Sequence, residues 1–574
     1  MPPSPANSRD HRHFWLLMTT ALIVVGVGIG LRDPWPSDEP RFALVARQMI
    51  ESGNWLFPHR GSELYADKPP MMMWAQAASF ELVRQWRVAF LLPSLLAALG
   101  TLALVYDLGR RLWNRRTGLY AAAALLFAFQ FVYQFKRAQI DPLVTLLITA
   151  GNWGLLRHLL LGPDWRAYWL GCFCAGLGVI TKGVGFLPLL LLLPYGFARW
   201  RDWPGVARMG PGQVIRWTLG PIALLVAIAL WLVPMLLSAR AHADDPAYAA
   251  YVQDILFHQT ADRYANSWGH IRSPLYYLPI VLFSWLPLSL AYPGLLPRWW
   301  NALKTKDARL LLPLAWVALV LLFFSIPAGK RDVYILPALP MVAVASAPFL
   351  EDLLRTRWLR AAGLVFITLL GTLALLAGVW ILATHPAAAE HWAAQRGFAR
   401  GPEPLAMALA ALGAVQLALV ATLRLRRAIW AIGGGMAALW FAWSLVIAPE
   451  LDASSSSAGL MAKVRDHLGP DDQLGLVAWK EQNLLMLGRP ATDFGFSQRW
   501  IWQYADAVAW QAENPARRWI FAQEPAMGDC VQRDHAIDLG KANRRQWWLF
   551  KADAVIPGCL PDPTIQGTDG DPSE

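Results

Sequence analysis

The chain has 574 residues, of which 56% are hydrophobic and only 16% are charged. Soluble globular proteins carry about 25% charged residues, so this composition excludes an ordinary soluble protein and indicates a polytopic α-helical membrane protein. The net charge of +11 fits basic loops beside anionic lipid, and it gives no reason to expect nucleic acid as a partner.

Apolar segments close to the length of about 20 residues that crosses a bilayer recur along the chain. They predict roughly thirteen transmembrane helices, and the boundaries near 181–183 and 326–333 are the hardest to place. The segments are 14–31, 88–106, 118–135, 140–156, 167–181, 183–198, 217–238, 274–296, 310–326, 333–350, 361–384, 404–422 and 428–448.

The distribution of Lys and Arg orients these helices, because short cytoplasmic loops are the basic ones. With the N-terminus inside, every short inner loop is basic: Arg110 to Arg116, Arg157 to Arg166, Arg199 to Arg216, Arg298 to Arg309, Arg355 to Arg360 and Arg424 to Arg427. The segments 32–87, 239–273 and 385–403 and the C-terminal residues 449–574 then face outward.

The first apolar segment has a cleaved signal peptide as its alternative interpretation, since both begin with charged residues followed by an apolar run. Its length and the absence of a small-x-small cleavage site before Asp38 favour a retained first helix. The other helices keep the same orientation under either interpretation.

The chain changes character at Pro449, which predicts a membrane domain over 1–448 and an outer domain over 449–574. Short apolar stretches at 474–479, 518–522 and 546–551 alternate with the helical segments 457–468 and 499–511, a pattern typical of a small α/β domain. Its two cysteines, Cys530 and Cys559, are expected to form a disulfide in an oxidising compartment. The domain carries no recognisable catalytic motif, so we assign it no chemistry.

The first outer loop holds the densest group of polar residues. It begins with Asp38-Glu39-Pro40-Arg41 and closes with Asp67-Lys68-Pro69-Pro70. Between them, apolar side chains recur at helical spacing and predict a helix that lies in the membrane interface. Asp38 stands at the start of this helix, so a simple capping role is its alternative interpretation.

Further ionisable residues are predicted on the same outer face. Asp141 opens the fourth apolar segment, and Lys182 and Lys330-Arg331 follow later segments. Ionisable groups at the mouth of a helix bundle are costly to place and are functional candidates for that reason. Carboxylates together with several cations beside lipid indicate chemistry on a lipid that carries phosphate.

Several short motifs occur in a fixed order over residues 14–350, and as a set they are specific. They are Asp38-Glu39-x-Arg41, Lys68-Pro69, Asp141, Thr181-Lys182-Gly183, Gly329-Lys330 and Tyr334-Ile335-Leu336-Pro337. In this order the chain resembles the GT-C membrane glycosyltransferases, in particular bacterial lipid A aminoarabinose transferases and protein O-mannosyltransferases. The resemblance implies transfer of a sugar from a polyprenyl-phosphate (undecaprenyl-phosphate) carrier to an acceptor at the periplasmic face of the inner membrane.

The resemblance also implies roles for individual residues. Catalytic roles fall to Asp38 and Asp141, and binding of the carrier phosphate falls to Arg41, Lys68, Lys330 and Tyr334. Candidate substrate contacts are Glu39, Asp67, Lys182, Arg263, His270 and Arg272. Asp67 stands where related proteins often have Glu, and His270 and Arg272 have lipid-headgroup contact as an equal alternative.

The chemistry agrees with these residue types. A hydroxyl acceptor needs a base such as Asp38 to take its proton in the transition state, and the phosphate that leaves gains from fixed cations. No cofactor is required, although a divalent cation remains a candidate. The expected partners are the lipid-linked sugar, a lipid A, glycan or protein acceptor of the envelope, and membrane lipids.

Two other classes of function stay open at this point. A lipid-linked sugar flippase or transporter also needs cations for a phosphate, but transporters place their sites near the midplane between internal repeats, and no repeated half is seen. A non-catalytic membrane scaffold would leave the cluster of Asp, Lys and Arg unexplained.

Overall fold

The computed structural model describes residues 5–208, 210, 212–257, 272–396, 398 and 400–564, with side chains from residue 12 onward. Within these residues, eight helices are long and apolar enough to cross a membrane, or up to ten if each of two bent pairs is one span. The bent pairs are 115–135 and 274–304, and two shorter apolar helices lie at Arg12–Gly26 and Val184–Trp200. The chain is therefore mostly helical, as its composition predicts.

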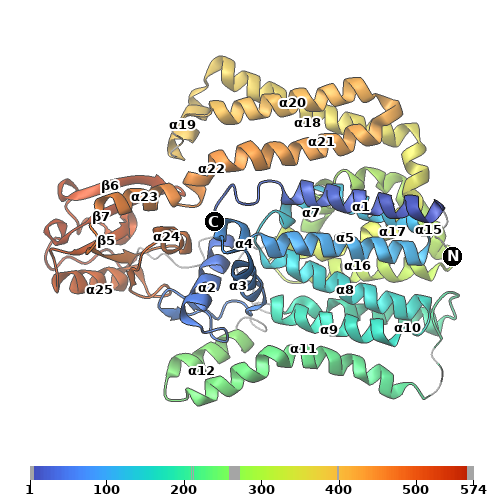
Figure 1. Ribbon diagram of the computed structural model, residues 1–574, viewed down its shortest axis with the longest axis horizontal. Coiled ribbons are helices and arrows are strands. Elements are labelled where there is room, and N and C mark those ends of the chain that lie inside the picture. The colour runs from blue at the N-terminus through green and yellow to red at the C-terminus, as the bar shows by residue number, and fades with distance from the viewer. Residues whose placement is uncertain are drawn as a thin grey trace.

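The helices of the bundle lie side by side along the long axis of the molecule (Figure 1). They are α1 (Pro5–Gly26), α5 (Leu92–Leu112), α6 (Arg115–Phe127), α7 (Phe129–Phe135), α8 (Ile140–Leu161), α9 (Trp165–Lys182), η1 (Val184–Leu191), α10 (Leu192–Trp200), α11 (Val214–Ala241), α14 (Tyr277–Phe283), α15 (Tyr292–Lys304), α16 (Ala308–Ser325), η5 (Asp332–Ala338), α17 (Leu339–Arg355), α18 (Arg357–Thr384), α20 (Glu403–Leu423), α21 (Ala428–Ala442), η7 (Trp443–Ile447) and α22 (Ala448–Ser455).

The position of each helix follows from its side chains. In the most apolar window of 332–355, 83% of the residues are buried, whereas the figure is 17% for α11 and for α18. Helix α18 buries a narrow stripe of small residues against α20, where a Cβ on Gly378 would lie 2.4 Å from the carbonyl oxygen of Ala406. Small residues let helices approach closely in a membrane. The buried fractions place α17 at the centre of the bundle, whereas α11 and α18 expose apolar faces.

The connections that carry polar motifs gather at one end of the bundle, on the left of Figure 1. They contain α2 (Glu39–Ser52), β1 (His59–Arg60), β2 (Glu63–Leu64), α3 (Met71–Val83), α4 (Trp86–Ala89), α12 (Pro246–Gln253) and α19 (Ala387–Gln395). The C-terminal region lies at the same end, and the N-terminus lies at the other. This arrangement brings together the segments that the charge pattern placed on one face.

The C-terminal region is built on a mixed five-stranded sheet with the order β4-β3-β5-β7-β6. Strand β3 pairs in parallel with β4 and β5, and β7 pairs antiparallel with β5 and β6. The elements are α23 (Ala458–His467), β3 (Gln473–Val477), α24 (Glu481–Leu487), β4 (Thr492–Asp493), α25 (Trp500–Ala512), β5 (Arg518–Gln523), α26 (Glu524–Met527), β6 (Ala536–Ala542) and β7 (Arg545–Phe550). The expected disulfide joins Cys530 and Cys559.

Helix α2 is confirmed, but its surroundings differ from the prediction of an interfacial helix. Phe42, Val45 and Met49 are buried in one apolar cluster with residues of α3 and of the C-terminal region, including Leu460 and Leu485. Protein and not lipid therefore covers the apolar face of α2. The first outer loop and the C-terminal region share a core, which fixes both against the mouth of the bundle.

Candidate active site

Asp38 lies at the start of α2 and faces the bundle. Its Oδ2 accepts a hydrogen bond of 2.9 Å from Nε2 of Gln139 and lies 4.0 Å from the guanidinium of Arg331. The residue makes no side-chain hydrogen bond to the first turn of α2, so it does not act as a helix cap. A carboxylate that is 20% exposed and is not used by its own helix is available to an incoming hydroxyl group.

Glu39 has a different environment from its neighbour. It is 1% exposed, and its two oxygens accept hydrogen bonds of 2.6 and 2.7 Å from Arg32. The same oxygens accept 2.8 Å bonds from the backbone N–H groups of Trp35 and Ala138. Burial opposes ionisation, but the charge and hydrogen bonds of Arg32 outweigh it and lower the pKa of Glu39 below 4.5. Glu39 thus ties the loop before Asp38 to the loop before α8, and its predicted substrate contact stays a prediction.

Asp141 and Lys182 form an ion pair across the mouth of the bundle. Asp141 sits in the first turn of α8 and Lys182 in the last turn of α9, and their side chains are 8% and 18% exposed. The Nζ of Lys182 also lies 4.9 Å from the centre of the Tyr334 ring, in cation–π contact. Three predicted site residues from α8, α9 and η5 thus form one group.

A second group of charges lies between the first outer loop and the C-terminal region. Nε of Arg41 donates a 2.9 Å hydrogen bond to Oε1 of Glu481, which lies 3.7 Å from Arg60. Arg60 in turn lies 3.4 Å from Asp67. The Asp38 carboxylate is close enough to Arg41 for its negative charge to favour the protonated guanidinium. The predicted carrier-phosphate residue Arg41 is therefore held by an acidic residue that sequence reasoning did not single out.

Lys68 and Tyr65 complete the wall of this group. Lys68 donates a hydrogen bond of 2.8 Å to the carbonyl oxygen of Asp67. Burial, and next the Asp67 carboxylate, raise the pKa of Tyr65, so its hydroxyl stays protonated. This hydroxyl is buried and has no hydrogen-bond partner among the described residues, and it remains available as a donor inside the charged group.

Lys330 is buried and held by backbone carbonyls. It is 3% exposed, and its Nζ donates to the carbonyl oxygens of Pro327 and Arg272, at 2.5 and 3.2 Å. It therefore ties the chain at 327–330 to the segment before α14, and its predicted contact with the carrier phosphate stays a prediction. Its neighbour Arg331, 41% exposed, lies 4.0 Å from Asp38.

The second outer segment is described only in part. Arg272 is exposed, and the structure shows its backbone N–H donating to Ala328 and its carbonyl oxygen accepting from Lys330. Arg263 and His270 lie outside the described residues, so their predicted substrate contacts stay predictions.

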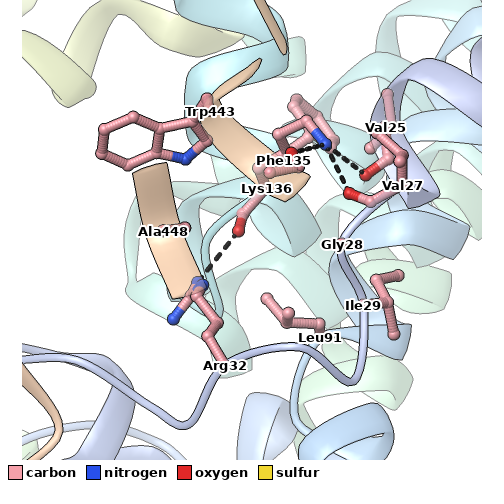
Figure 2. A pocket seen from close by; sticks show the side chains of 11 residues that line it. Val25, Val27, Gly28, Ile29, Arg32, Leu91, Phe135, Lys136, Trp443 and Ala448 are labelled. Atoms are coloured by element: carbon pink, nitrogen blue, oxygen red, sulfur yellow. Dashed lines mark hydrogen bonds between the residues drawn. The ribbon is translucent and has the colours of Figure 1, made fainter. Parts of the chain in front are cut away.

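A small pocket beneath this site contains two buried cations, Arg32 and Lys136 (Figure 2). Nζ of Lys136 donates to the carbonyl oxygens of Val25 and Val27 and to Oγ of Ser444, at 3.1, 2.9 and 2.8 Å. Arg32 donates to the carbonyl oxygen of Lys136 at 3.1 Å. All three ammonium hydrogens thus have acceptors, so Lys136 joins α1 to η7 and supports the Arg32–Glu39 pair.

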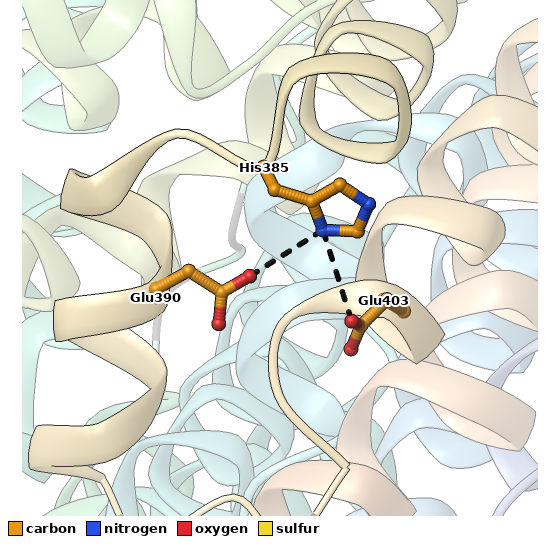
Figure 3. A group of neighbouring side chains, drawn as sticks. All are labelled: His385, Glu390 and Glu403. Carbon is orange, nitrogen blue, oxygen red and sulfur yellow. Dashed lines mark ion pairs between the residues drawn. The ribbon is translucent and has the colours of Figure 1, made fainter.

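Three side chains among the described residues lie close enough together to hold a metal ion. They are His385, Glu390 and Glu403, between the C-terminal end of α18 and the N-terminal end of α20 (Figure 3). Nδ1 of His385 lies 3.5 and 3.9 Å from the two carboxylates, as ion pairs do. At Asp67 and Glu481 the carboxylates face arginines, which disfavours a divalent cation there.

The sequence is similar to known proteins over much of its length. Residues 67–232 match the family described as dolichyl-phosphate-mannose-protein mannosyltransferase. The undecaprenyl phosphate-alpha-4-amino-4-deoxy-L-arabinose arabinosyl transferase of Enterobacter sp. (strain 638) is 31% identical over 63% of this chain and 64% of its own length. The undecaprenyl phosphate-alpha-4-amino-4-deoxy-L-arabinose arabinosyl transferase 2 of Sodalis glossinidius (strain morsitans) is 31% identical over 56% of each chain. The matched regions thus span 64% and 56% of the length of these two relatives.

Solved structures agree in fold. ArnT from Cupriavidus metallidurans bound to undecaprenyl phosphate superposes with a TM-score of 0.72 at 22% identity, over 93% of this chain and 97% of that chain. Its apo state gives the same TM-score at 21% identity, over 96% and 100%. Residues 67–232 are therefore similar to this mannosyltransferase family, and the chain has the fold of ArnT, which confirms its resemblance to the GT-C membrane glycosyltransferases.

Proposed function

We propose that the chain is a glycosyltransferase that moves a sugar from undecaprenyl phosphate, or a similar polyprenyl phosphate, to a lipid A-type acceptor. The observation that carries the proposal is the position of Asp38, a partly exposed carboxylate beside Arg331, with Arg41 one helical turn away. The named activity of the two arabinosyl transferases supports this choice of donor.

In this proposal the acceptor hydroxyl attacks the anomeric carbon of the donor sugar while Asp38 takes the hydroxyl proton. The bond between that carbon and the phosphate oxygen breaks, and the polyprenyl phosphate leaves with the electron pair. The departing phosphate needs cations more than a proton, and Arg41, Lys68 and Arg331 suit that need. Lys182 and Tyr334 border the site through the Asp141 pair.

The orientation of the chain is part of the proposal. The N-terminus faces the cytoplasm, and the site and residues 449–574 face the periplasm, because the basic loops lie between helix ends remote from the site. The predicted thirteen spans and the domain boundary at 448/449 belong to the same picture. Residues 449–574 then form a periplasmic domain that covers the site on its periplasmic side.

The acceptor has a second candidate class. The family matched by residues 67–232 transfers mannose to protein, as its description states, so a protein acceptor is the alternative to lipid A. Incubating purified protein with labelled undecaprenyl-phosphate sugars and either lipid A or envelope proteins distinguishes the two. Label in lipid A supports the proposal, label in protein supports the alternative, and no label from any donor contradicts both.

A further inference from the structure

We propose that Glu481 of the C-terminal region positions the guanidinium of Arg41 for the carrier phosphate, which makes this region part of the donor site. The inference rests on the proposed function, because it concerns how the same site holds its donor. It assigns a role in the reaction to a region in which the sequence shows no catalytic motif.

Glu481 accepts from Nε of Arg41 at 2.9 Å, and the two side chains are 5% and 22% exposed. The contact uses one edge of the guanidinium, and its terminal amino groups make no hydrogen bond within the described part of the chain. A planar guanidinium held at Nε presents these groups as a fork, which is the geometry that binds a phosphate.

Glu481 itself is rigidly placed. It begins α24, where the backbone N–H of Lys480 donates to Oδ1 of Asn483 at 2.8 Å. The next residues, Gln482 and Asn483, are 3% and 0% exposed. The carboxylate therefore cannot follow a mobile Arg41, and the arginine must adopt the position that Glu481 sets.

This part of the C-terminal region is docked on the loop that carries Arg41. Asp493 accepts hydrogen bonds from the backbone and the hydroxyl group of Ser62, at 3.0 and 2.7 Å. Glu63 accepts from Ser497, and the guanidinium of Arg60 lies 3.8 Å from the centre of the Phe496 ring. These contacts surround the Arg41–Glu481 pair and hold the two segments, 440 residues apart in sequence, in fixed register.

Glu481 lowers the net positive charge beside the phosphate site, so a purely electrostatic view predicts tighter phosphate binding when it is removed. Ordering a long Arg side chain costs conformational entropy, and Glu481 removes that cost before the donor arrives. Because the carboxylate is fixed and buried, we expect orientation to outweigh charge, and its loss to weaken binding.

The test is a double-mutant cycle on the full-length protein, with binding of sugar-free undecaprenyl phosphate as the readout. Glu481→Ala is expected to raise the Kd about tenfold when Arg41 is present, and to change it little in an Arg41→Ala background, since coupled residues are not additive. Glu481→Gln, which keeps the size and one acceptor oxygen, is expected to lie between and covers the case in which the alanine variant does not fold. Glu51→Gln is the matched control, because it removes an exposed carboxylate of α2 that pairs with Arg47 and lies outside the docking contacts.

The outcomes separate the two proposals. An equal rise of Kd in both backgrounds, an unchanged Kd, or tighter binding in Glu481→Ala overturns the role of Glu481. A wild-type protein that binds undecaprenyl phosphate but transfers no sugar contradicts the proposed function and leaves the cycle measurable. A rise of Kd in Glu481→Ala that disappears in the Arg41→Ala background, with Glu51→Gln like wild type, supports the inference.

Discussion

Replacing Glu39 by Gln tests whether the ion pair behind Asp38 holds the site together. In the structure, each carboxylate oxygen of Glu39 accepts one bond from Arg32 and one from a backbone N–H group. A glutamine of the same size keeps one accepting oxygen and turns its amino group toward two donors. Two of the four hydrogen bonds are therefore lost, and the Arg32 charge stays buried without its partner.

The expected cost follows from this count. Removing one partner of a buried ion pair lowers the free energy of unfolding by about 3–5 kcal/mol, because the remaining charge is left uncompensated. The tie between Trp35 and Ala138 is weakened at the same time, so Asp38 loses its fixed position. Sugar transfer by Glu39→Gln is expected to fall even at temperatures where the variant is folded.

Denaturant unfolding of the purified protein in detergent, followed by tryptophan fluorescence, measures the first effect. Glu51→Gln is the matched control: Glu51 lies on the same helix and pairs with Arg47, but it is 56% exposed, and such pairs contribute at most about 1 kcal/mol. Equal unfolding free energies for the two variants would refute the view that Glu39 anchors the site.

Three further predictions follow from the same contacts. Because Arg32 lowers the pKa of Glu39, the difference in unfolding free energy between wild type and Glu39→Gln should be constant above pH 4.5. The difference should shrink as the pH falls through the lower pKa of the folded state, and unfolding at a series of pH values measures it. Lys182→Ala leaves Asp141 without its cation and should lower kcat/KM for transfer about 100-fold, whereas Lys182→Arg, measured in parallel, should retain most activity; equal values for both would count against the pair. Changing Cys530 and Cys559 to Ser opens a loop with a sequence separation of 29 residues and should destabilise the C-terminal region by about 2–4 kcal/mol, seen as faster limited proteolysis, and unchanged proteolysis would exclude that stabilising role.

Much of the fold could be predicted because its signals are local. The length of the apolar segments marks α5, α8 and α18, and the short apolar stretches of the C-terminal region overlap strands β3, β5 and β7. The charges of the loops group the outer segments at one end. Helix α9 and the pieces η1 and α10 show the limit, since breaks inside an apolar run leave no clear mark in its hydropathy.

The site was predictable only where a motif carried it. Asp38 and Asp141 face the mouth of the bundle, and Lys182 pairs with the latter. Glu39 and Lys330 stand beside Asp38 and Arg331 in sequence, but their side chains point to a buried arginine and to backbone carbonyls. Neighbouring residues on a loop can face opposite directions, and hydropathy does not report which.

Glu481 shows why the rest of the site could not be predicted. It lies in a region without a recognised motif, and it meets Arg41 only because α2 and α24 bury apolar faces against each other. Lys136 likewise joins α1 to η7, by donating to the carbonyl oxygen of Val25 and to Oγ of Ser444. A contact across hundreds of residues, built on packing, leaves no spacing pattern in one sequence.

The most direct measurement is sugar transfer by Asp38→Asn, compared with wild type and with the surface variant Glu51→Gln, together with binding of undecaprenyl phosphate. Asn keeps the size of the side chain but cannot take a proton, so the account predicts normal carrier binding and transfer reduced by about 100-fold to 10,000-fold. A folded Asp38→Asn protein that transfers sugar at the wild-type rate would contradict the account.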